Sequence, residues 1–101
     1  MIALPQTVRL HEAQRALDAA LGQLDERLRA APAQALDVDL SGVHDYDSSL
    51  LALMLGLARR AAADGGSVRF TGAPDNLYRL AALYGVDELL LTPRRAEAAT
   101  P

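Results

Sequence analysis

The segment from residue 36 to residue 40 constrains the fold of this chain more than any other. Leu36, Val38 and Leu40 alternate there with two aspartates, and an alternation of period two is typical of a strand with one apolar face. Such a strand must bury that face against another layer, because an isolated strand cannot keep water away from it. The rest of the chain must supply that layer.

Two longer segments have the periodicity of amphipathic helices. In residues 11–30, leucines follow one another at spacings of four, three and four, so they lie on one face of a helix that Pro32 would end. From Ser48, a second apolar stripe recurs at helical spacing until residues 64–66, where glycine suits the left-handed end of a helix. The stripe residues are Leu17, Leu21, Leu24 and Leu28 in the first helix, and Leu51, Leu55, Ala58 and Ala62 in the second.

Shorter elements complete an alternation of strands and helices. Residues 7–10 and 67–71 have the pattern of strands. Asp75 can cap a helix that Gly85 ends, and an apolar segment at 86–91 closes the fold. This order predicts an α/β fold, a small mixed or parallel sheet with crossover helices packed on it. The predicted core residues are Leu36, Val38, Leu40, Leu51, Leu55, Val68, Phe70, Leu77 and Leu80.

Length and composition favour one domain that folds without disulfides. A chain of 101 residues is too short for two self-sustaining cores. We therefore expect a single domain over residues 1–101, with its core at about 7–91 and a frayed, flexible tail at 92–101. The chain has no cysteine, which excludes disulfides and thiolate metal sites. It also has no lysine, which excludes Schiff-base chemistry and a phosphate-loop lysine.

Charge and hydropathy argue against nucleic-acid binding and against direct membrane insertion. The net charge is −3 and the 10 basic residues, all arginine, are spread along the chain, so no basic patch is expected. The longest uncharged apolar stretch, residues 50–58, is far shorter than the roughly 20 residues that span a bilayer. The first residues lack the basic and long apolar segments of a signal peptide. The cytoplasm is the expected location.

One segment is specific enough to indicate a family. It reads Asp39-Leu40-Ser41-Gly42-Val43-His44-Asp45-Tyr46-Asp47-Ser48-Ser49. It resembles the signature of the STAS family, the sulfate-transporter and anti-sigma-factor-antagonist domain, in which a strand ending in Asp-Leu-Ser is followed by a loop and an Asp-Ser-Ser step into a helix. The chain departs from the family pattern at Leu50, where glycine is usual, and in an abbreviated N-terminal strand pair. The resemblance covers about residues 36–91 and implies a single STAS-type domain.

A second segment points to one branch of that family. It reads Leu77-Tyr78-Arg79-Leu80-Ala81-Ala82-Leu83-Tyr84-Gly85-Val86 and resembles the last helix of the MlaB branch. That branch is the STAS subunit of the Mla ABC transport complex, which maintains lipid asymmetry of the outer membrane in Gram-negative bacteria. The resemblance implies a non-enzymatic subunit, without cofactor or catalytic residues, that binds and stabilises the MlaF-like cytosolic ATPase subunit. Through the ATPase it would be associated with a permease complex in the inner membrane.

Ser48 and Ser49 stand at the predicted start of a helix, where the simplest role of a hydroxyl is to cap backbone N–H groups. A helix N-terminus also favours a phosphate, and in the phosphorelay branch of the family the serine matching Ser48 is the phosphoacceptor. The alternative function is therefore an anti-sigma-factor antagonist regulated by phosphorylation of Ser48. In the MlaB branch, the same position lies against the ATPase.

A second leucine stripe on the same helix suggests the partner surface. This stripe, Leu50, Leu53 and Leu57, points away from the Leu51 and Leu55 stripe on an ideal helix, and one face cannot bury both. Either a neighbouring helix covers it, or it forms an exposed apolar patch beside Ser48, as a binding surface would. We expect the exposed patch, extended by a tyrosine and an arginine of the later helix, residue types enriched at interfaces. The expected partner-binding residues are Ser48, Ser49, Leu50, Leu53, Leu57, Tyr78 and Arg79.

Clustered acids suggest two further kinds of site, and both are disfavoured. The cluster consists of Asp37, Asp39, Asp45 and Asp47, with His44 among them. A magnesium site is disfavoured because a polar strand face and a helix start already account for acids at these positions. A small phosphatase that uses Asp37 and Asp39 is disfavoured because the chain is short and has no lysine. His11 and His44 lack a spaced partner that would make a zinc pair or a catalytic couple, so we expect both at the surface.

Overall fold

Strands and helices alternate through the computed structural model, which describes residues 1–31 and 35–91. The strands are β1 Ile2–Ala3, β2 Thr7–Val8, β3 Ala35–Asp39, β4 Asp45–Tyr46 and β5 Ser67–Thr71. The helices are α1 Leu10–Ala30, α2 Ser49–Ala63, α3 Asp75–Leu83 and α4 Asp87–Leu90. The α/β class predicted from the alternating pattern is confirmed. The predictions for Pro32 and for the tail at residues 92–101 lie outside the described residues.

The central sheet contains three parallel strands in the order β1-β3-β5. Val38 of β3 lies in register with Ile2 on one side and Phe70 on the other. Each step from one strand to the next passes through a helix, first α1 and then α2, because parallel neighbours need a crossover connection. β1 was not expected from the sequence, since two residues are too few to show an alternation.

A separate parallel pair, β2 with β4, joins two segments that the sequence left unconnected. Thr7 pairs with Asp45 and Val8 pairs with Tyr46, so the segment between β3 and α2 contains a short strand. The expected strand at 7–10 is shorter than predicted, because α1 already begins at Leu10. This pairing brings the first turn of α1 next to the first turn of α2.

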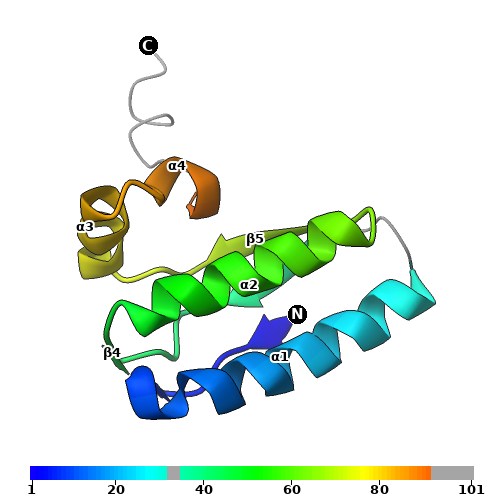
Figure 1. Ribbon diagram of the computed structural model, residues 1–101, viewed down its shortest axis with the longest axis horizontal. Helices are drawn as coiled ribbons and strands as arrows, with labels where there is room; N and C mark the ends of the chain where they lie inside the picture. The colour runs from blue at the N-terminus through cyan, green and yellow to red at the C-terminus, as the bar shows by residue number, and fades with distance from the viewer. Residues whose placement is uncertain (32–34, 92–101) are drawn as a thin grey trace.

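Figure 1 shows α1 and α2 side by side in front of the central sheet. A Cβ atom on Gly56 of α2 would lie 3.1 Å from Cδ1 of Leu17 on α1, so the missing side chain permits a close approach of the two helices. α2 also packs on β5 and is thus covered on two sides. α3 and α4 lie beyond the N-terminal half of α2 (Figure 1), and α3 ends before Gly85, which has a φ of 72°.

Most of the predicted core is confirmed. Leu36, Val38, Leu40, Leu51, Phe70 and Leu77 are buried. Leu55, Val68 and Leu80 are only partly buried and pack against the edge of the core. The two histidines, His11 and His44, are exposed as expected.

Gly72 is the position outside the core where an added small side chain should destabilise the folded domain most. It follows β5 with a φ of 70°, and an added Cβ would lie 2.9 Å from Cβ of Ser41 and 3.1 Å from its backbone nitrogen. We expect Gly72→Ala to lower the free energy of unfolding by roughly 2–3 kcal/mol in a denaturant titration. Gly65→Ala is the matched control, because Gly65 has a φ of 81° but nothing within 4 Å of the added atom. It should lose only about 1 kcal/mol, and equal losses would contradict the predicted clash.

Candidate partner-binding site

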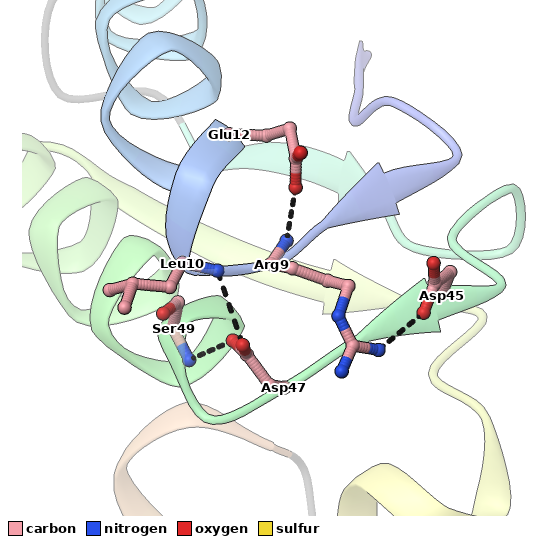
Figure 2. Close-up of polar contacts among 6 residues, drawn as sticks. All are labelled: Arg9, Leu10, Glu12, Asp45, Asp47 and Ser49. Carbon is pink, nitrogen blue, oxygen red and sulfur yellow. Dashed lines mark hydrogen bonds and ion pairs between the residues drawn. The ribbon is translucent and has the colours of Figure 1, made fainter.

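The carboxylate of Asp47 joins the first turns of α1 and α2, as Figure 2 shows. Its Oδ1 accepts a hydrogen bond of 2.9 Å from the backbone N–H of Ser49. Its Oδ2 accepts one of 3.1 Å from the backbone N–H of Leu10. The first N–H groups of a helix have no partner within the helix, so one side chain satisfies such a donor on each of two helices.

The surrounding contacts fix this junction. Glu12 accepts a hydrogen bond of 3.1 Å from the backbone N–H of Arg9 through Oε1, which closes the start of α1 in the manner of a capping box. The Arg9 guanidinium lies 2.6 Å from Oδ1 of Asp45. Both of those side chains are about half exposed, so this ion pair contributes little to stability. The hydrogen bonds from the backbone N–H groups and the β2–β4 pairing hold the segment between β4 and α2 in place.

Asp47 is held in its charged form. The hydrogen bond from the Ser49 backbone N–H is the main cause that lowers the pKa of Asp47, and the Leu10 N–H and the positive charge of Arg9 lower it further. Hydrogen bonds from Ser41 likewise lower the pKa of Asp39. Both carboxylates are therefore more readily ionised in the folded chain than in the unfolded chain.

This electrostatic arrangement predicts a pH dependence of stability. A carboxyl with a lowered pKa in the folded state contributes stability above its ordinary pKa, about 4, and loses it as the pH falls through the folded-state pKa. The thermal midpoint should therefore fall when the pH is lowered below about 4. Asp47→Asn should lower the midpoint at neutral pH, because the amide keeps one acceptor oxygen and no charge. Its midpoint should fall less on acidification, and the fall that remains should come from Asp39 and other acids. An equal fall of the thermal midpoint with pH in the two proteins, measured by circular dichroism, would contradict this.

Ser48 and Ser49 do not have the capping role expected of them. Asp47 caps α2, and the hydroxyl of Ser48 makes no capping hydrogen bond. The backbone carbonyl of Ser48 accepts from Leu51 N–H at 3.0 Å, so Ser48 already belongs to the first turn. Its side chain is exposed, whereas Ser49 is half-buried.

The expected exposure of the second leucine stripe is wrong. Leu50, Leu53 and Leu57 are at most 1% exposed, and α1 packs along α2 on one side while β5 packs on the other. The stripe is the centre of the buried face of α2, and Leu55 of the first stripe lies at its margin. Their side chains do not form the expected exposed patch, and Leu53 reaches the surface only as part of the lining of a hollow.

Two shallow hollows flank the first turns of α2 instead. The α3 hollow has a volume of about 280 Å³ and the α1 hollow about 270 Å³. The α3 hollow is lined by Ser48, Leu51, Ala52, Leu55, Tyr84 and Val86. The α1 hollow is lined by Leu10, Ala13, Gln14, Leu17, Ser49, Ala52 and Leu53. Neither lining contains a charged residue, and Ala52 belongs to both.

Two outer walls of these hollows are exposed apolar side chains that the sequence did not single out. Leu10 is 73% exposed and Tyr84 is 56% exposed. Leu10 lies inside the expected strand at residues 7–10, and Tyr84 lies in the segment that resembles the last helix of the MlaB branch. Tyr78 and Arg79, which were expected at the interface, line neither hollow. Tyr78 is half-buried and Arg79 is exposed.

Other features of the described residues lie away from this surface or point to no chemistry. A larger hollow of about 460 Å³ lies between the β1–β2 segment and α1. Within residues 1–31 and 35–91 there is no group of three or more histidines and acids that could hold a metal ion. In the same part of the chain, every helix is too short or too polar to cross a membrane.

Comparison with protein families decides the assignment of this fold. A family model described as "Mlab, STAS domain" matches residues 5–92. The chain belongs to the STAS family. A comparison with curated proteins found no match. In this STAS domain, the Asp47-Ser48-Ser49 step that carried the resemblance is the junction of α1 and α2, and its aspartate is the shared cap.

Proposed function

We propose that this STAS domain is the non-catalytic subunit of an Mla-type phospholipid-transport ABC complex and that it binds and stabilises the cytosolic ATPase. The MlaB-type family match supports this assignment. The observation that carries the docking site is the uncharged surface around Ser48 and Ala52, with its two hollows and the exposed side chain of Tyr84. Charge-poor surfaces with aromatic side chains are typical of the central part of protein interfaces. The domain would act at the cytoplasmic side of the inner membrane, attached to the permease through the ATPase.

Ala52→Glu tests this docking site. Ala52 is exposed and lines both hollows, so a carboxylate there leaves the core intact and enters the contact. We expect binding to the purified ATPase subunit, measured by calorimetric titration, to weaken roughly ten- to hundredfold, because an unpaired charge is desolvated. Thermal melts of the free domain should be nearly unchanged.

Ala62→Glu is the matched control for that variant. Ala62 is also an exposed alanine of α2 and lies near the opposite end of the helix, away from both hollows. Its binding should stay within about twofold of the wild type. If both variants bind like the wild type, the ATPase does not dock on the start of α2. If the wild type does not bind at all, the proposed function is wrong.

A second candidate function is an anti-sigma-factor antagonist controlled by phosphorylation. The observation that favours it is the exposed hydroxyl of Ser48, which makes no capping hydrogen bond. Mass spectrometry of the protein isolated from its own cells should then find phosphate on Ser48.

Under the first proposed function, a Ser48→Asp variant should weaken ATPase binding less than Ala52→Glu, because the helix N-terminus favours a negative charge there.

A further inference from the structure

Leu10 is an exposed leucine on a backbone that is fixed from three directions. Its N–H donates to Asp47, the preceding N–H of Arg9 donates to Glu12, and the Arg9 carbonyl accepts from two N–H groups of the first turn at 2.9 Å. The side chain is nevertheless 73% exposed. Single exposed leucines are common, so exposure alone decides nothing.

The position of Leu10 beside the α1 hollow is what distinguishes it. The hollow has no charged lining residue and a volume of about 270 Å³, below the roughly 300–1,000 Å³ of small-molecule sites. It suits one aliphatic or aromatic side chain of a protein partner. It is also continuous with the proposed docking surface, because Ala52 forms a wall of both hollows and Ser49 follows Ser48 directly.

We infer that the α1 hollow receives an apolar side chain of the same ATPase partner, that Leu10 packs against it, and that Asp47 positions Leu10 for this contact. This inference rests on the proposed function. Asp47 is a positioning residue here, since its own oxygens are engaged by Leu10 N–H and Ser49 N–H. The charge that caps α2 thereby also sets the distance between Leu10 and the Ser48 surface.

A serine at position 47 can separate the two roles of the aspartate. Serine is as good an N-cap as aspartate, but it ends in one oxygen, one atom closer to the backbone. Asp47→Ser should therefore keep the bond to Ser49 N–H and lose the bond to Leu10 N–H. In hydrogen exchange, the Leu10 amide should exchange faster while the Ser49 amide stays protected.

The decisive experiment is a double-mutant cycle of Leu10→Ala and Asp47→Ser, measured by calorimetric titration with the purified ATPase subunit. Leu10→Ala should weaken binding roughly ten- to hundredfold, as expected for loss of a desolvated leucine, with little change in the thermal midpoint. Asp47→Ser should weaken it by a similar factor in the wild-type background. In the Leu10→Ala background it should add less than about twofold, because the residue that it positions is gone.

Two variants control for general effects. Leu89→Ala removes another leucine that is 73% exposed but lines neither hollow. Asp45→Ser removes a neighbouring carboxylate, on β4, which pairs with Arg9 and does not contact Leu10 N–H. Both should bind within about twofold of the wild type. Wild-type affinity of Leu10→Ala, or independent effects of the two substitutions, would overturn the inference while leaving the proposed function intact. Absence of binding by the wild type would refute the proposed function and this inference together.

Discussion

Leu53→Glu is expected to unfold the domain. Leu53 is 1% exposed in the centre of the buried face of α2, between α1 and β5, and no charged side chain is buried among the described residues to pair with a new carboxylate. An unpaired buried charge costs several kcal/mol, comparable with the total stability of roughly 5–15 kcal/mol of a small domain. Circular dichroism should show loss of helix at room temperature or a very low thermal midpoint.

The adjacent residue supplies the control for this prediction. Ala52→Glu puts the same charge one position earlier on the exposed side of α2 and should melt close to the wild type. The pair therefore tests the direction in which α2 is buried. A well-folded Leu53→Glu protein would mean that the second leucine stripe is accessible to water, contrary to the structure.

Leu57→Ala should produce the second-largest effect, a loss of about 3 kcal/mol in the free energy of unfolding. Leu57 is 0% exposed, and its truncation leaves a cavity where α2 is covered on both sides. For a domain of this size, the thermal midpoint should fall on the order of 10–20 °C. Leu55→Ala is the matched truncation at a partly buried position, and it should cost about 1 kcal/mol.

The comparison between these two leucines distinguishes the two possible orientations of α2. Differential scanning calorimetry of both variants under one condition gives the order of their midpoints directly. A larger loss for Leu55→Ala than for Leu57→Ala would place the first stripe at the centre of the core and would contradict the arrangement of α1 on α2.

The strands and helices that carry their own periodicity could be predicted from the sequence. The alternation in β3, the glycine stop after α2 and the leucine spacing of α1 are local patterns, and they led to the observed α/β order. The short strands β1 and β4 could not be predicted in this way, and β2 was predicted only as part of a longer strand at residues 7–10. Each has two residues, and only pairing with a distant segment makes them strands.

The burial of the second leucine stripe could not be predicted from the sequence. α2 is apolar on two stripes, and a helix of that kind is covered on two sides, which requires knowing where α1 lies. Local sequence also cannot show that Asp47, rather than either serine, caps α2. Its second oxygen bonds to Leu10, 37 residues earlier, so the shared cap exists only in the tertiary structure.

The parallel order β1-β3-β5 has a consequence for how the chain reaches its native state. The pairing of β3 with β5 and the helix between them lie within residues 35–71, so this β-α-β unit can pair its two strands before α1 docks. Until α1 docks on it, the leucines on the other side of α2 stay in contact with water. We expect an early collapsed species that binds hydrophobic dyes and aggregates at high concentration. Packing of the N-terminal 30 residues onto this unit would then cover these leucines and end the tendency to aggregate.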